Sequence, residues 1–190
     1  AIDLDEINKT FYDGRRTVYD GPIPPGLEGY PEDGISPSGT RGPNLAKAQQ
    51  LLVEAGYPNG EGLPPIRFYT TQTAENNAVS EMVKRQLAEV NIEFEAVFMD
   101  FSTMIENLIK RKSPMFGYAW GSDYPDAENN LALFYGPNSS PGANRFNYSR
   151  PEYDAMYEQI LTMGPSEERT EIYIKMRDMV LDDCAYVGGM

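Results

Sequence analysis

The sequence predicts an α/β fold, in which a mainly parallel sheet carries helices on both faces and is followed by C-terminal helices. Short apolar stretches alternate with amphipathic ones between residues 66 and 120, which is the pattern of strands joined by helices. Strands joined by helical crossovers pair in parallel, and such crossovers are right-handed. The last third of the chain shows helical periodicity only, so helices are expected to follow the sheet.

A loop-rich, extended arm is expected at residues 1–43, ahead of an α/β lobe at 44–190. A short helix is predicted at 1–11, where apolar residues share one side. The stretch 21–43 is rich in glycine, proline and serine and therefore cannot hold a helix. It is expected to be either a linker or a segment packed on another part of the protein.

The lobe is expected to open with a helix and to continue with three strands. The helix is predicted over 44–55, where Asn44 is suited to cap its start and Gly56 to end it. Strands are predicted at 66–70, 92–99 and 115–120. The third strand is apolar throughout, which is typical of a central strand buried on both faces.

Helices are expected between these strands. The first begins at Thr71 or Thr73 and continues to about Glu89, with apolar residues at helical spacing. The second follows a capping box formed by Thr103 and Glu106.

Two further helices are predicted in the last third of the chain. Ser149 and Glu152 form a second capping box, with Pro151 in the first turn. Beyond a Gly-Pro break, Ser166 is suited to cap a helix that continues to about Asp183.

The composition excludes several classes of function. The formal net charge of -13 argues against nucleic acid and anionic membranes as partners, since both attract clustered Lys and Arg. The absence of histidine excludes Ser-His-Asp and Cys-His catalysis and disfavours a zinc site. The single cysteine, Cys184, cannot form an internal disulfide. We therefore expect no metal and no cofactor.

A candidate binding site follows the third predicted strand. Ligands of open parallel sheets bind beyond the carboxyl ends of the strands. The strand ends in Trp120, and the loop after it contains Gly121, Ser122, Asp123, Tyr124, Pro125 and Asp126. A carboxylate beside a large aromatic ring suits a ligand with a cation, such as a free α-amino group, next to an apolar part. In the alternative interpretation, Asp123 or Asp126 caps the next helix and Trp120 belongs to the core.

The loop and the strand before it resemble a known signature. Residues 115–133 resemble the signature of the family 5 extracellular solute-binding proteins, which are the oligopeptide-, dipeptide- and nickel-binding components of ABC importers. Further segments resemble motifs of this family in the family's order: 1–7, 21–25, 46–60 and 148–154. The resemblance implies a periplasmic-binding-protein-like lobe of type II, with ligand-binding function and no enzymatic activity.

The resemblance also implies a larger protein and a set of partners. Members of this family have two lobes joined by a hinge, and this chain matches their later portion, so it is expected to be a fragment without the N-terminal lobe. The implied partners are a peptide or other small solute, the ABC permease in the membrane, and that N-terminal lobe. The implied location is periplasmic or otherwise extracytoplasmic, with a lipid anchor in an N-terminal region outside this sequence.

Residue roles are carried over from the family only where the motifs match. An aspartate that follows the Trp-x-x motif binds the N-terminal ammonium in peptide-binding members, and Asp123 matches it. Arg145 lies in a region that the family places near its cleft and is expected either to reach a ligand carboxylate or to be a surface arginine. The family's arginine before the tryptophan is replaced by Gly117-Tyr118-Ala119, which leaves the ligand class open.

Two other functions remain as alternatives. A hydrolase would use Asp123 and Asp126 as paired carboxylates, although no second motif accompanies them. A sensor or chaperone-like binding protein can be built on the same fold, because fold alone does not decide function.

Overall fold

The structure is a computed structural model that describes residues 1–19, 21–31 and 42–188. Its contacts divide the chain into two units. The first unit is Ala1–Arg16 with Gly42–Tyr118, and the second is Thr17–Arg41 with Ala119–Met190. The expected arm is thus divided between the units: its residues 1–16 and 42–43 belong to the first unit and its residues 17–41 to the second, and residues 32–41 lie outside the described part. The division into an arm and a ligand-binding lobe stays a prediction.

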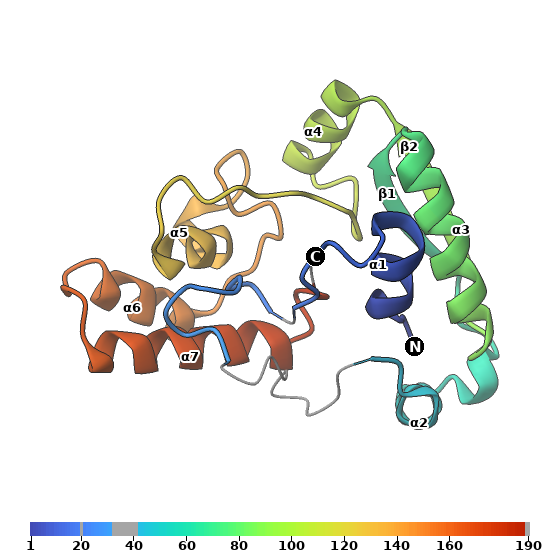
Figure 1. Cartoon of the computed structure of the whole chain (residues 1–190), viewed down its shortest axis with the longest axis horizontal. Helices are drawn as coiled ribbons and strands as arrows, with labels where there is room; N and C mark the ends of the chain where they lie inside the picture. The colour runs from blue at the N-terminus through green and yellow to red at the C-terminus, as the bar shows by residue number, and fades with distance from the viewer. Residues whose placement is uncertain (20, 32–41, 189–190) are drawn as a thin grey trace. The chain divides into compact units, whose positions relative to one another are not determined.

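The first unit is built on a pair of parallel strands, β1 (Ile66–Thr71) and β2 (Phe94–Met99). Their register runs from Ile66 opposite Phe94 to Thr71 opposite Met99. The crossover between them is α3 (Ala74–Ala88), which lies beside the strands in Figure 1. The Thr73 side chain accepts a hydrogen bond from the backbone N–H of Asn76 at 3.0 Å and so caps this helix. Both strands, the crossover and the parallel pairing confirm the predicted fold class.

The third predicted strand, 115–120, is wrong in its length and its place. It is reduced to a parallel bridge between Tyr69 and Phe116, held by two backbone hydrogen bonds of 2.9 and 3.0 Å. Since β1 has β2 on one side and this bridge on the other, β1 is central and the bridge is an edge. The apolar character of residues 115–120 predicts burial on both faces, yet Tyr118 and Trp120 are exposed.

Three further helices belong to the first unit: α1 (Leu4–Tyr12), α2 (Leu45–Glu54) and α4 (Phe101–Ile109). A one-turn helix, η1 (Pro58–Gly60), follows α2. Asn44 caps α2 as predicted, accepting from the Lys47 N–H at 2.9 Å. The capping box predicted at Thr103 and Glu106 is wrong, because α4 begins earlier and Asp100 is its N-cap. Glu106 instead forms an ion pair with Lys110, one turn further along the helix.

The second unit is helical. Its elements are α5 (Ala127–Leu131), η2 (Ala132–Phe134), η3 (Gly136–Asn138), α6 (Pro151–Ile160) and α7 (Glu167–Asp182). Ser166 caps α7 as predicted, accepting from the Arg169 N–H at 3.2 Å. The capping box predicted at Ser149 and Glu152 is wrong, because Arg150 is the N-cap of α6 and its side chain makes no capping bond. Proline at the first helical position reduces the need for a cap, since it has no N–H to satisfy.

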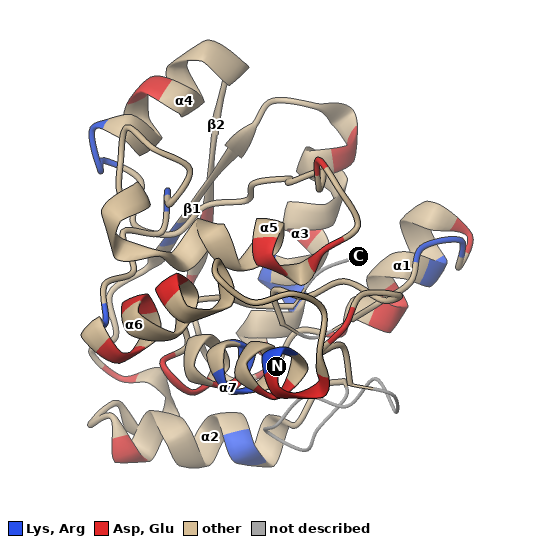
Figure 2. Ribbon diagram, turned by 90° about the vertical axis from the view of Figure 1, so that its left-hand side faces the viewer, with Lys and Arg blue, Asp and Glu red and all other residues tan. Residues whose placement is uncertain are grey.

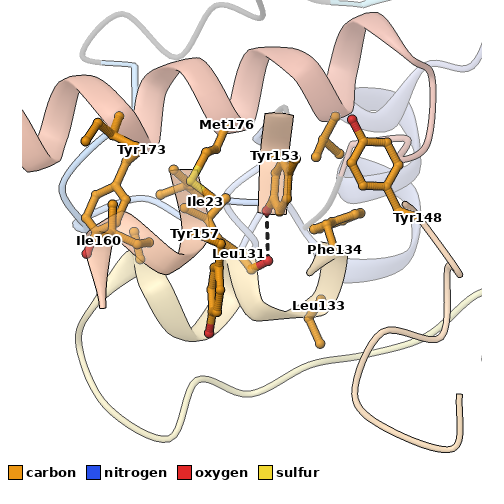
Figure 3. Packing of buried hydrophobic residues seen from close by; sticks show 13 residues of the cluster. Ile23, Leu131, Leu133, Phe134, Tyr148, Tyr153, Tyr157, Ile160, Tyr173 and Met176 are labelled. Carbon is orange, nitrogen blue, oxygen red and sulfur yellow. Dashed lines mark hydrogen bonds between the residues drawn. The ribbon is translucent and has the colours of Figure 1, made fainter. Parts of the chain in front are cut away.

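The interior of the second unit joins α5, α6 and α7 with part of the arm (Figure 3). The Tyr153 hydroxyl of α6 donates to the Leu131 carbonyl of α5 at 2.8 Å, shown as a dashed line in Figure 3. Ile23 is fully buried in this core, and the guanidinium of Arg177 donates to the Gly29 carbonyl at 2.6 Å. The part of the arm around Ile23 and Gly29 thus packs on the core that carries α5.

Acidic residues outnumber basic ones by 29 to 16, and Figure 2 shows both kinds on helices of both units, including α2 and α7. None of the helices in the described part of the chain combines the length and the apolar character needed to cross a membrane.

Candidate functional site

The candidate turn, residues 120–124, lies on the surface of the second unit and leads into α5. Trp120 is 38% exposed and Tyr124 is 46% exposed. The interpretation of Trp120 as a core residue is therefore wrong. Gly121, Ser122 and Asp123 are exposed as well, so the whole turn is open to solvent.

Asn129 of α5 bonds both Trp120 and Asp123. Its side-chain oxygen accepts from the Trp120 indole N–H at 3.1 Å and from the Asp123 backbone N–H at 3.2 Å. Its amide nitrogen lies 3.5 Å from Oδ2 of Asp123, which is at the long limit of a hydrogen bond. The aromatic ring and the carboxylate are thus held by one buried side chain.

The neighbours of Asn129 bond the rest of the turn. The Ser122 hydroxyl donates to the side-chain oxygen of Asn130 at 2.6 Å. The Tyr124 hydroxyl donates to the carboxylate of Glu128, which also accepts from Tyr157 of α6. Three consecutive buried residues of α5 therefore contact four residues of the exposed turn.

Asp126 has a structural role. Its Oδ1 accepts from the Glu128 backbone N–H at 2.9 Å and from the Tyr173 hydroxyl at 2.5 Å. Its Oδ2 accepts from the guanidinium of Arg169 at 2.7 Å, forming an ion pair. Partial burial raises the pKa of Asp126, but the bonds from Tyr173, Glu128 and Arg169 outweigh it, so the net pKa is lower than usual. Of the two expected capping candidates, Asp126 caps α5 and Asp123 does not.

Arg145 lies in the loop between η3 and α6. Its guanidinium donates to the Pro141 carbonyl at 2.7 Å, a bond within the same loop. Asn144 fixes this loop by donating to the carbonyls of Tyr135 and Tyr148 at 3.0 and 2.8 Å. Among the described residues, no hydrogen bond or ion pair joins Arg145 to residues 120–124, so the structure groups the other five predicted site residues and leaves Arg145 apart.

Sequence reasoning missed Glu128, Asn129 and Asn130. All three are at most 8% exposed, although their residue types usually lie on the surface. Buried polar side chains require hydrogen-bonding partners, so a polar run next to the apolar residues 131–134 was the available signal. Within the described ranges, no group of three or more Cys, Asp or Glu side chains is arranged to hold a metal ion.

Residues 1–142 match the family described as bacterial extracellular solute-binding proteins, family 5 Middle. Among curated proteins, the chain is similar to glutathione-binding protein GsiB of Escherichia coli K12, with 26% identity over 200 residues. It is also similar to heme-binding protein A of Haemophilus influenzae, with 23% identity over 199 residues. Each alignment covers 98% of this chain but only 36% and 34% of the relative, so the chain spans about a third of their length.

Two solved structures show the same fold over nearly the whole chain. One is the periplasmic binding protein DppA from Helicobacter pylori in complex with the peptide STSA, with a TM-score of 0.84 and 24% identity. The other is a dipeptide-binding protein from Pseudoalteromonas sp. SM9913 in complex with Met-Leu, with a TM-score of 0.85 and 19% identity. Both matches cover 98% of this chain, and 36% and 37% of the respective structures. The family match spans most of the sequence, and we conclude that the chain belongs to the family 5 bacterial extracellular solute-binding proteins.

Proposed function

We propose that this chain forms part of the substrate-binding component of an ABC importer, which captures peptides or similar small solutes outside the cytoplasmic membrane. The observation that carries the proposal is the exposed turn, in which Asp123 and Trp120 share the buried partner Asn129. Membership of a solute-binding family supports it. The proposal includes a location in the periplasm or on the outer side of the membrane, with a lipid anchor.

The chemistry of the turn suits an α-ammonium group. Asp123 is exposed, and its long contact with Asn129 leaves oxygen lone pairs available to a ligand cation. A charge-assisted bond between a carboxylate and an ammonium contributes about 1.5–3 kcal/mol. The exposed ring of Trp120 offers apolar area next to it, where a backbone or a side chain of the ligand can pack.

The ligands named for several relatives have the chemical groups that this turn suits. Glutathione and peptides such as Met-Leu each carry a free amino group next to apolar or weakly polar parts, and these are the ligands named for relatives of this chain. Heme, named for another relative, lacks such a group. We therefore place peptides and peptide-like solutes first for this chain, with Gly121, Ser122 and Tyr124 as further contacts and Arg145 as a candidate for the ligand carboxylate.

The proposed mechanism consists of reversible ligand binding and a change of conformation, without a chemical reaction of the ligand. Ligand binding favours a closed arrangement of two lobes over an open one, and the membrane permease recognises the closed arrangement. The present chain supplies the wall with the turn, and the N-terminal lobe supplies the opposite wall. No bond of the ligand is broken, so the ligand is expected to be recovered intact.

The pair Asp123 and Asp126 is poorly suited to hydrolysis. Both oxygens of Asp126 already accept hydrogen bonds from Arg169, Tyr173 and the α5 backbone. Its lowered pKa, with burial outweighed by these bonds, keeps the carboxyl ionised at neutral pH and unsuited to act as a general acid. The geometry therefore favours binding over glycoside- or peptide-bond cleavage.

A capture experiment tests the function. The full-length protein is incubated with a peptide library, washed, and its retained ligands are identified by mass spectrometry. Intact peptides in stoichiometric amounts support the proposal, and cleaved products would support the hydrolase. Retention of unfolded proteins but not of peptides would point to the chaperone-like alternative. The 190-residue chain alone is expected to retain peptides weakly, because the proposal assigns the opposite wall to sequence outside it.

A further inference from the structure

Asn129 stands out among the residues beneath the turn. It is 7% exposed, and its one side-chain oxygen accepts from two donors that belong to different parts of the turn. Those donors are the indole of Trp120 and the backbone of Asp123, the two residues to which the proposed site assigns stacking and charge. Asn130 has the same residue type and a similar burial of 6%, but within the described part of the chain its side chain has one bonding partner, Ser122.

The position of Asn129 is itself set by the core. Two residues further along α5, Leu131 is fully buried, and its carbonyl accepts from Tyr153 of α6 at 2.8 Å. At the start of α5, Asp126 is fixed by Arg169 and Tyr173 of α7. The short helix that carries Asn129 is therefore bonded to the core near both of its ends, and Asn129 in turn bonds the turn.

We infer that Asn129 is a positioning residue for the ligand: it fixes the Asp123 carboxylate relative to the Trp120 ring before the ligand arrives. This inference rests on the proposed function. A ligand that carries an ammonium next to an apolar group is received by both residues at once only if their relative placement is set. Binding to a prearranged pair avoids the entropic cost of ordering two side chains during binding.

If Asn129 only stabilised the folded turn, its loss would affect a different set of ligands than the loss of a positioning residue would. Loss of a structural bond weakens the binding of every ligand alike, because it reduces the fraction of correctly folded turn. Loss of positioning weakens the binding of ligands with a free amino group most, because the Asp123 carboxylate is the group that becomes misplaced. Ligands whose amino group is blocked already lack that interaction and have little left to lose.

The test compares Asn129→Leu with the matched control Asn130→Leu in the full-length protein. Each variant is dialysed against a synthetic tripeptide mixture with free amino termini and against the same mixture after N-acetylation, and retained peptide is quantified by mass spectrometry. We expect Asn129→Leu to weaken retention of the free mixture about tenfold and of the acetylated mixture less than twofold. Asn130→Leu is expected to change both by less than threefold.

Each alternative outcome has a distinct meaning. Equal losses for the free and acetylated mixtures, or equal losses in the two variants, would overturn the positioning role while leaving the proposed function intact. Unchanged retention of the free mixture by Asn129→Leu would also overturn the positioning role and leave the proposed function intact. If the unmodified protein retains neither mixture, the proposed function fails, and the inference fails with it.

A second variant guards against misfolding of the first. Asn129→Asp keeps an oxygen that accepts from Trp120 and Asp123, but places a second negative charge next to Oδ2 of Asp123. Because the two positioning bonds can still form, this variant should retain the free mixture better than Asn129→Leu does. The indole N–H resonance of Trp120, identified by its loss in Trp120→Phe, reports whether the bond to residue 129 persists. Retention of the free mixture as low as that of Asn129→Leu, together with a retained indole resonance, contradicts the inference.

Discussion

The two units of this chain bury different kinds of side chain. In the first unit, the buried residues around the strands are mostly aliphatic or aromatic hydrocarbons, such as Leu87, Phe94 and Leu108, and its ion pairs lie on the surface. In the second unit, tyrosines fill much of the core, and Glu128, Arg169 and Arg177 are buried as well. The polar interior of the second unit lies under the turn that we propose as the binding site. Buried polar groups that are fully bonded favour one arrangement over others, which is what a prearranged site requires.

Removal of an ion pair is expected to lower the free energy of unfolding far more in the second unit than in the first. Arg169→Leu leaves Asp126 without its cation in a partly buried place, and we expect it to lower the free energy of unfolding of the second unit by about 3 kcal/mol. The matched change Arg67→Leu removes an exposed pair with Glu95, whose side chains are 63% and 51% exposed, and should cost less than about 1 kcal/mol. Urea unfolding followed by the fluorescence of Trp120, the single tryptophan, measures the first, and circular dichroism measures the second. Equal costs would remove the contrast.

The next largest expected effect is a loss of ligand affinity when the charge of Asp123 is removed. Asp123→Asn removes the charge but keeps the shape of the side chain, so we expect the affinity for peptides with a free amino group to fall at least about tenfold, or 1.4 kcal/mol. Isothermal titration of the full-length protein measures it. Asp100→Asn, which alters an exposed helix cap in the first unit, serves as the control and should leave the dissociation constant unchanged. An unaltered constant for Asp123→Asn would remove this residue from the site.

Alkaline pH is expected to affect the second unit first. Burial, followed by the bond to Asp126, raises the pKa of Tyr173, and burial, followed by the bond to Glu128, raises that of Tyr157. Because the folded pKa lies above the unfolded value near 10, this stabilisation is complete below pH 10 and is lost as pH rises above it. Each tyrosine contributes a loss of at most about 1.4 kcal/mol per pH unit in that window. Unfolding monitored at several pH values in Tyr157→Phe should show a shallower slope than the unmodified chain, and an identical slope would count against it.

A smaller effect is expected where a tyrosine bonds the backbone in the core. Tyr153→Phe leaves the Leu131 carbonyl without this donor and should cost about 1 kcal/mol in unfolding free energy. Tyr12→Phe, the control in the first unit, removes an exposed bond to Glu75 and should cost less than about 0.5 kcal/mol. Thermal unfolding followed by circular dichroism ranks the two, and the comparison between the units loses its basis if their order is reversed.

Much of the fold was predictable because it depends on neighbours in sequence. The caps at Asn44, Thr73 and Ser166 each bond a backbone N–H three residues later, so the local pattern contains the whole interaction. The two capping boxes that were wrong also depend on local choices, but Asp100, three residues before Thr103, caps α4, and α6 begins with a proline after an N-cap that makes no capping bond. The strand at 115–120 failed because apolar character alone does not show whether a partner is present on both sides.

The sequence by itself determined the α/β class, the parallel pair of strands, several helix ends and the family, because periodicity, caps and motifs depend on consecutive residues, and it also led to the turn that we propose as the binding site. The tertiary structure alone decided that Asp126 forms an ion pair with Arg169, 43 residues further along the chain, and that the side chain of Asn129 accepts hydrogen bonds from both Trp120 and Asp123. Such bonds form only where packing of the core brings a donor and an acceptor within about 3.5 Å of each other. No local sequence pattern specifies that distance.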